Sequence, residues 1–388
     1  MPLTRLAREW ADTPPNRLSE ELEIFRSRGV RIIDLVTANP HEHGLTFPQE
    51  ELLGIAAAGM VRAAVYRPDP LGQRPAREAV AAFYKARGAE ADPQRIVLTA
   101  GTSLAYFYAI QLLADPGMEI LAPEPGYPVF DDIAALCGVA LRRYHLRVSE
   151  GRWRLDIDDL TFQITPRTRA VIVVSPHNPT GMVMSNGEWS ALGALCRERR
   201  LPVVADEVFS EFLAPPLATL PRPEPGAFPL LITLNGLSKM LSLPGWKVAW
   251  MKVEGDPKLV EPFLKALERL SDAFLPVNEL AQAMVPDLLR SGLRGAIERL
   301  ARDYTERRSL VRRVLEWPQP PEPEGGVYLC VRLAGSADDE EFALRALREQ
   351  HVLVHPGYLY NMPGYIVFTC VPRPEILVEG LTRLNKMI

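Results

Sequence analysis

A lysine stands at the end of a stretch that the sequence predicts to be a buried strand. Lys239 follows the aliphatic run LLITLNG, residues 230–236, and precedes the Pro244-Gly245 pair. An ammonium group in this position is partly removed from water, so it can lose its proton, and the free amine can then attack an aldehyde to form a Schiff base. Because most lysines are solvated surface residues, Lys239 needs partners before this chemistry can be inferred.

Three other short stretches end in groups that could serve such a reaction. Asp206 closes the run LPVVAD, where its carboxylate could pair with a protonated ring nitrogen or simply cap the next helix. The turn TAGTS contains Gly101, Thr102 and Ser103 and opens into a helical pattern, so its amide groups could bind a phosphate, although an ordinary turn has the same composition. Asn178, in SPHNPTG, could be no more than part of an Asn-Pro turn.

The elements around these residues indicate a parallel sheet. Aliphatic runs that finish in polar or Gly/Pro residues predict buried strands, and there are five of them: RIVLTAGTS, MEILAPEPGY, RAVIVVSPHN, LPVVADEVF and LLITLNGLSK. Helical patterns between them, such as residues 103–114 and 186–200, predict an α/β fold with a sheet covered on both faces. Open parallel sheets bind ligands beyond the carboxyl ends of their strands, so we expect the candidate groups, with Tyr127 and Ser238, to converge there.

Composition and charge favour a small-molecule partner. The chain has 388 residues and a net charge of -4, from 44 basic and 48 acidic residues, which offers no large positive field for nucleic acid. The four cysteines fit neither a metal-binding spacing nor a disulfide framework, and His41 and His43 lack further clustered ligands, so we expect no metal. No apolar run approaches the ~20 residues that span a bilayer, and the N-terminus has no apolar leader, so we expect a cytoplasmic protein with no membrane attachment.

Two proline-rich stretches suggest a division of the chain. Residues 214–229 contain six prolines and residues 316–326 contain four, which predicts loops. The strand and helix patterns after the second stretch are shorter, which indicates a smaller α+β domain. We therefore expect an N-terminal segment over residues 1–46 that packs with the small domain, a large domain over residues 47–275 and a small C-terminal domain over residues 276–388.

Taken together, the motifs resemble those of the class I and II aminotransferases, which are pyridoxal phosphate (PLP) enzymes of fold type I. NGLSKMLSLPGWKVAW is similar to the family signature SKxxxxPGxRxGW, and YRPDPLGQRPAREAVAAFY, LTAGTS, PEPGYP, SPHNPTG and ADEVF also follow the family in order and spacing. The resemblance covers roughly residues 30–375. It implies PLP as the cofactor and a large domain with a mostly parallel seven-stranded sheet, together with a smaller α+β domain.

The resemblance also implies roles for individual residues. Lys239 would carry the internal aldimine and act as general base and acid, Asp206 would hold the pyridinium nitrogen, and Tyr127 would stack on the ring; these three are the expected catalytic residues. The further cofactor-binding residues would be Asn178 at the ring hydroxyl, Phe209 beside it, and Gly101, Thr102, Ser103, Ser238 and Lys247 at the phosphate. Tyr66 of a second subunit would reach the same phosphate, which implies a homodimer with shared active sites.

Three positions depart from the usual family pattern. Phe209, in DEVF, replaces a tyrosine that helps to bind the ring hydroxyl, and Lys247, in PGxK, keeps the charge of an arginine but loses its planar fork. Val367 aligns with the arginine that usually binds the substrate carboxylate, so the chain resembles a divergent branch. Arg373 is a candidate replacement and Asn39 a second candidate for substrate contact, although a solvated loop position is the simpler explanation of Arg373.

We expect an aminotransferase that moves an amino group between an L-amino acid and a 2-oxo acid by a ping-pong mechanism. Another PLP-dependent reaction on the same scaffold, that of a β-lyase, racemase or oxidase, stays open because a fold does not fix the chemistry. A non-catalytic binding protein with the same fold is a third hypothesis, suggested by the absent arginine. The sequence names neither the donor nor the acceptor.

Overall fold

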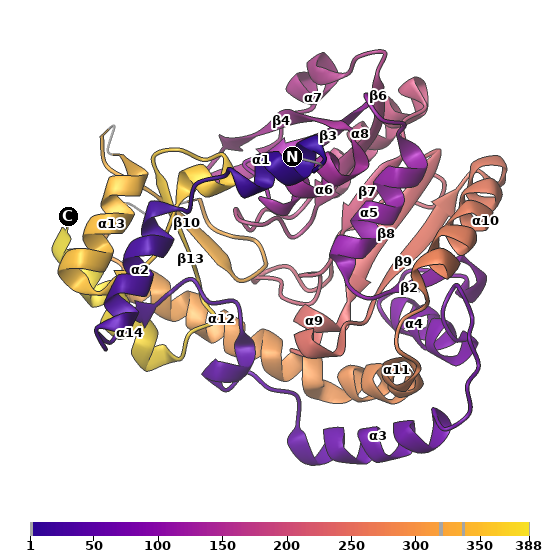
Figure 1. The fold of residues 1–388 in the computed structure, drawn as a ribbon, viewed down its shortest axis with the longest axis horizontal. Coiled ribbons are helices and arrows are strands. Elements are labelled where there is room, and N and C mark those ends of the chain that lie inside the picture. Colours follow the sequence, from indigo (N-terminus) through magenta and orange to yellow (C-terminus); the bar gives the residue numbers. More distant parts are fainter. Residues whose placement is uncertain (1–2, 318–320, 336–337, 388) are drawn as a thin grey trace.

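A computed structural model describes residues 3–317, 321–335 and 338–387, so part of the proline-rich stretch 316–326 lies outside the described residues. The chain forms two parts, one built on a large sheet and one on a small sheet, with the helix α12 (Ile297–Val314) running between them (Figure 1). No described helix is both long enough and apolar enough to cross a bilayer.

The large sheet has eight strands among the described residues, in the order β2-β9-β8-β7-β6-β3-β4-β5. Strands β8, β7, β6, β3 and β4 are parallel, whereas β9 is antiparallel to both of its neighbours and β5 is antiparallel to β4. The predicted α/β fold class is confirmed. The sheet has eight strands where seven were expected, because β5 pairs with β4 as a hairpin and adds one strand to the edge. The strands are β2 (Ile96–Thr99), β3 (Glu119–Glu124), β4 (Ala140–Ser149), β5 (Arg152–Leu155), β6 (Thr168–Val174), β7 (Val203–Asp206), β8 (Leu230–Gly236) and β9 (Ala249–Gly255).

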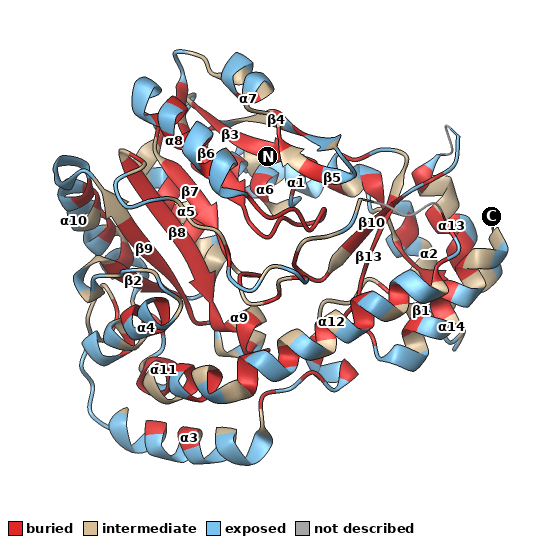
Figure 2. Cartoon of the chain, turned by 180° about the vertical axis from the view of Figure 1, so that it is seen from behind, coloured by how far each residue is buried: buried red, intermediate tan, exposed pale blue. Residues whose placement is uncertain are grey.

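Helices cover both faces of this sheet because its strands are apolar on both sides (Figure 2). Along β6, Ala170, Ile172 and Val174 contact one helical layer, and Val171 and Val173 contact the other, as the two-residue repeat of a strand requires. The first layer contains α5 (Thr102–Leu113), α6 (Val129–Cys137) and α10 (Pro257–Phe274), and the second contains α7 (Ile157–Gln163) and α8 (Asn186–Arg199). A third cluster joins β2 and β9 to α3 (Gln49–Arg62), α4 (Arg74–Ala86) and α11 (Glu279–Ser291).

The smaller part contains the antiparallel sheet β10-β13-β12 and a short parallel pair, β1 with β11. Its strands are β1 (Ile33–Asp34), β10 (Tyr328–Arg332), β11 (Val352–Leu353), β12 (His355–Pro356) and β13 (Tyr365–Thr369), and its helices are α2 (Arg17–Ser27), α13 (Asp339–Gln350) and α14 (Pro374–Leu384), with α12. The short helix α1 (Arg5–Ala11), which has no buried residue, precedes them. The N-terminal segment contacts this part, since Arg17 pairs with Glu340 at 2.9 Å and β1 pairs with β11.

Packing places α11 with the large sheet and α12 with the small part. The two helices are joined by a short π-helical segment, Gly292–Ala296, in which Gly295 has the non-helical φ of +123°. We therefore propose that the boundary between the two domains lies near Gly295, rather than at residue 275 as the sequence suggested.

Candidate active site

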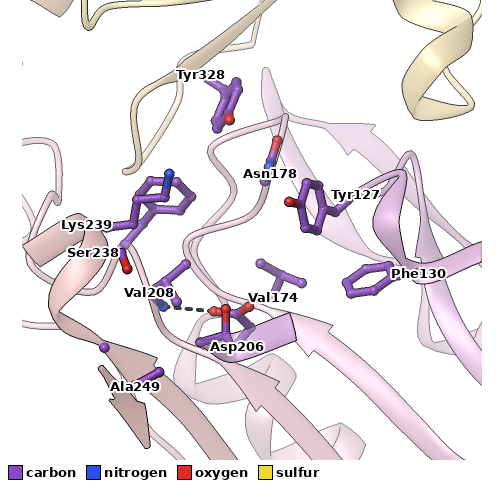
Figure 3. Close-up of a pocket in the computed structure, with 13 residues that line it drawn as sticks. Tyr127, Phe130, Val174, Asn178, Asp206, Val208, Ser238, Lys239, Ala249 and Tyr328 are labelled. Atoms are coloured by element: carbon purple, nitrogen blue, oxygen red, sulfur yellow. Dashed lines mark hydrogen bonds between the residues drawn. The ribbon is translucent and has the colours of Figure 1, made fainter. Parts of the chain in front are cut away.

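A pocket lies beyond the carboxyl ends of β7 and β8, where the sheet rule predicts a ligand site (Figure 3). Seven of the predicted residues line it: Thr102, Tyr127, Asn178, Asp206, Phe209, Ser238 and Lys239. Six residues that the sequence did not indicate complete the lining: Phe130, Val174, Val208, Gly236, Ala249 and Tyr328. Residues widely separated along the chain are therefore gathered around one cavity, and Tyr328 brings the small sheet into contact with it.

Lys239 is carried by a one-turn helix, α9 (Leu237–Met240), which begins where β8 ends. Gly236 joins the two elements at a very close approach of backbones: a β-carbon there would lie 2.8 Å from the β-carbon of Ala249 and 2.9 Å from the carbonyl oxygen of Val248. The Nζ atom of Lys239 lies 5.8 Å from the centre of the Phe209 ring. Burial lowers the pKa of Lys239, while the charge of Asp206 opposes that shift. The amine is therefore easier to deprotonate than that of a surface lysine.

Asp206 is buried at the end of β7, and each of its oxygens accepts a hydrogen bond. Oδ1 accepts from the backbone N–H of Val208 and Oδ2 accepts from the hydroxyl of Tyr106, both at 2.9 Å. Burial raises the pKa of Asp206 to about 6, although the two hydrogen bonds lower it. The neighbouring Glu207 has a different role, because it forms an ion pair with Arg222 at 3.0 Å. Only the first acid of the DE pair faces the pocket.

The remaining walls are an amide and a group of aromatic rings. Asn178 is buried, and its Oδ1 atom has no hydrogen-bond partner among the described residues. Tyr127 lies edge-to-face with Phe130, with ring centres 5.8 Å apart and planes at 84°. Across the pocket, Tyr328 of β10 lies edge-to-face with Phe209 at 6.0 Å and 83°. These contacts fix the orientation of the rings that enclose the cavity.

The N-terminus of α5 lies at one end of the pocket. Gly101 precedes the helix with φ +137° and ψ 159°, which only glycine adopts easily, and a β-carbon there would meet nothing within 4 Å. No side chain of the described residues caps this helix, so its first amide groups can bind an anion. Thr102 lines the pocket, whereas Ser103 and Lys247 are exposed and do not.

Besides Gly101, Ser103 and Lys247, the predicted residues Tyr66, Asn39 and Arg373 also lie outside the pocket lining. Tyr66, between α3 and α4, is 77 % exposed. Asn39 uses its side-chain amide to contact Glu42 at 2.7 Å, and Arg373 is exposed at the start of α14. Val367 is 1 % exposed within β13 and lies in an apolar cluster.

Potential metal ligands show no grouping in the described part of the chain. No cluster of three or more His, Cys, Asp or Glu side chains that could hold a metal ion is found there. His43 is buried in the segment Pro40–His43, and neither of its ring nitrogens has a hydrogen-bond partner among the described residues. The four cysteines are buried and form no disulfide.

Comparison with known proteins places this chain in a family. Residues 48–381 match the family described as aminotransferase class I and II. Arginine–pyruvate transaminase AruH of Pseudomonas aeruginosa is 32% identical over 324 residues, which is 81% of this chain and 80% of that protein. Glutamate–pyruvate aminotransferase AlaA of Escherichia coli is 28% identical over 92% of this chain and 90% of its own length.

The fold agrees with this assignment. The solved structure of an alanine aminotransferase from Pyrococcus furiosus superimposes with a TM-score of 0.85 at 26% identity and covers 95% of this chain and 94% of that chain. The sequence match, the mostly parallel sheet and the grouping of Lys239, Asp206 and Asn178 in one pocket agree. The chain belongs to the class I and II aminotransferases.

Proposed function

We propose that this aminotransferase carries out its reaction in the pocket around Lys239, with PLP as cofactor, and moves an amino group between an L-amino acid and a 2-oxo acid in two half-reactions. The observation that carries the proposal is that the amine of Lys239 and the buried carboxylate of Asp206 line the same pocket. An amine of lowered pKa and a carboxylate in one cavity, beside a stacking ring and free helix amides, match the parts of this cofactor one by one.

The pocket residues fit PLP in charge and in hydrogen-bonding capacity. The unpartnered Oδ1 of Asn178 can accept a hydrogen bond from the ring hydroxyl. Tyr127 offers a ring face for stacking, and Asp206 retains lone pairs that can accept from a protonated ring nitrogen. The free amides at the start of α5 suit the phosphate, with Ser238 nearby on α9.

Each of the principal residues has one task in the proposed reaction. PLP supplies an electron sink for the electrons released at the substrate Cα. Lys239, with its lowered pKa, would take the proton from Cα as a general base and return a proton as a general acid. Asp206 would keep the ring nitrogen protonated by accepting its hydrogen bond, and Tyr127 would hold the ring plane.

The described lining of the pocket offers no obvious second cation that could bind a substrate carboxylate. Lys239 is the single cationic side chain in the described lining, and Val367 is apolar and buried. Arg373 stays a prediction for this role, because it is exposed beside α14 and outside the lining. AruH and AlaA both have pyruvate in their names, and on that ground we propose pyruvate as the first acceptor to assay.

A homodimer with shared sites is proposed from the exposed face of α3. Ile55 and Gly59 of this helix face the core, whereas Leu53, Met60 and Val61 are 65, 63 and 77 % exposed. Such an apolar face suits a second copy of the chain, and Tyr66 follows it directly. A hybrid of Lys239→Ala and Tyr66→Ala subunits tests sharing: one of its two sites would be intact, so activity should exceed that of either parent.

The reaction class is tested by supplying an amino donor without any acceptor. A transaminase releases about one equivalent of 2-oxo acid per subunit and no ammonia, and turnover resumes when pyruvate is added. A β-lyase would instead release ammonia over many turnovers, an oxidase would consume oxygen, and a racemase would form no oxo acid. Binding of PLP without any of these reactions across a broad amino-acid panel would favour a non-catalytic binding protein and overturn the proposal.

A further inference from the structure

Tyr106 contacts the pocket from behind, through Asp206. Its side chain is 1 % exposed and lies on α5, and its hydroxyl donates to Oδ2 of Asp206 at 2.9 Å. The hydroxyl makes no other hydrogen bond among the described residues. It does not line the pocket. The hydroxyl therefore contacts the site only through this carboxylate.

The position of this contact follows from the repeats of the two elements. In β7, Val203 and Ala205 point to one layer, and Val204 and Asp206 point to the layer that contains α5. In α5, Tyr106 comes one turn after Thr102, so the two residues share a face of the helix. Thr102 lines the pocket, and Tyr106 therefore meets the carboxylate one turn deeper.

The ring of Tyr106 is fixed by its packing. It lies edge-to-face with Phe130, with centres 5.1 Å apart and planes at 70°, and Phe130 in turn contacts Tyr127. The hydroxyl consequently has a defined direction, towards Oδ2. Since Oδ1 is held by the N–H of Val208, the carboxylate can rotate only by breaking one of two hydrogen bonds.

We propose that Tyr106 is a positioning residue for the cofactor: its hydroxyl orients Asp206 and keeps the proton shared between this carboxylate and the PLP ring on the ring nitrogen. This inference rests on the proposed PLP site. A hydrogen bond donated to a carboxylate stabilises its charged form, so the carboxylate becomes less basic. Without the phenol, Asp206 draws the shared proton towards itself, and the ring becomes a weaker electron sink.

The test compares Tyr106→Phe with the wild-type enzyme, using PLP labelled with ¹⁵N in the ring. We expect the ring-nitrogen resonance of Tyr106→Phe to move towards that of neutral pyridine. The dissociation constant of PLP from the apoenzyme should rise about 10- to 100-fold, the range expected for a hydrogen bond to a charged group. Both effects should be absent when Tyr106→Phe is introduced into an Asp206→Asn background.

A matched control is available in Tyr144→Phe. Tyr144 is also 1 % exposed, but its hydroxyl donates to the backbone carbonyl of Ile172 at 2.8 Å. This variant should lose stability without moving the nitrogen resonance. A second substitution that keeps the hydroxyl, 3-fluorotyrosine at position 106, covers the case in which Tyr106→Phe folds poorly. The fluorine makes the phenol a stronger donor and should move the resonance in the opposite direction, towards pyridinium.

Two results would overturn the inference. One is a Tyr106→Phe enzyme whose nitrogen resonance and PLP affinity match those of the wild type. The other is a 3-fluorotyrosine enzyme whose resonance does not move. Either result leaves the proposed function intact provided that wild-type protein binds PLP, whereas failure of the wild type to bind PLP would refute the proposed function itself.

Discussion

Replacing Asp206 by asparagine should make the apoenzyme more stable to unfolding and the PLP-bound enzyme less stable. Burial raises the pKa of Asp206 from 3.8 to about 6 in the folded protein without cofactor. A carboxyl whose folded pKa lies above its unfolded value stabilises the fold at low pH, and this stability is lost as the pH rises from about 4 through 6. The shift of roughly two units limits the loss to about 3 kcal/mol. Asparagine fits the site, because its oxygen can accept from Val208 and its nitrogen can donate to the oxygen of Tyr106.

Urea unfolding of the two apoproteins at pH 5 and pH 8, at equal subunit concentration, measures this effect. Part of the loss has already occurred at pH 5. Between pH 5 and pH 8, the free energy of unfolding of Asp206→Asn should therefore rise by about 1.5 kcal/mol relative to that of the wild type. In the presence of PLP the order should reverse, because asparagine cannot balance a protonated ring nitrogen. If the difference in free energy of unfolding between the two proteins is the same at pH 5 and pH 8, ionisation of the buried carboxylate does not destabilise the apoprotein and the reasoning is refuted.

Three further substitutions separate the remaining parts of the site. Lys239→Ala should abolish turnover and the absorbance of covalently bound cofactor, whereas Lys258→Ala, at an exposed lysine, should retain both in a spectrophotometric assay. Asn178→Ala should weaken PLP binding about 10-fold while leaving the free energy of unfolding of the apoprotein nearly unchanged. The reason is that the Oδ1 atom it removes has no hydrogen-bond partner in the described structure. PLP titration and urea unfolding test this, and a loss of stability without a loss of PLP affinity would contradict it. Gly236→Ala should lower the free energy of unfolding by about 1–3 kcal/mol, because its methyl group would overlap the backbone at the start of β9. Gly245→Ala is the control, since a β-carbon at Gly245 would meet nothing within 4 Å. Equal melting temperatures of the two variants would refute the steric argument.

The sequence predicted the parts of the site that depend on local order along the chain. Asp206 ends a strand with a clear aliphatic run, and Lys239 and Thr102 follow two others; the binding of ligands beyond the carboxyl ends of parallel strands then brings them together. The five predicted runs did not include β4, β5 or β9. Strand β5 is the hardest of these to predict, because RWRL is short and charged and forms a strand by pairing with β4.

Residues whose role depends on packing between distant elements were harder to predict. Tyr328 reaches the pocket from a different sheet, about ninety residues after Lys239, so no local pattern indicates it. Tyr106 could have been found, since the two-residue repeat of β7 and the four-residue spacing from Thr102 both direct it towards Asp206. The pattern of aromatic residues on α5 resembles ordinary core packing, which conceals that role.

The contribution of Tyr328 from β10 has an evolutionary consequence. Lys239, Asp206 and Asn178 stand at the ends of buried strands or in tightly packed loops, where any change in volume disturbs the core. The wall that Tyr328 provides belongs to a separate three-stranded sheet. Mutations there can alter which molecules are accepted while the groups that handle protons stay untouched, so new activities should arise first by exchange of residues on this small sheet.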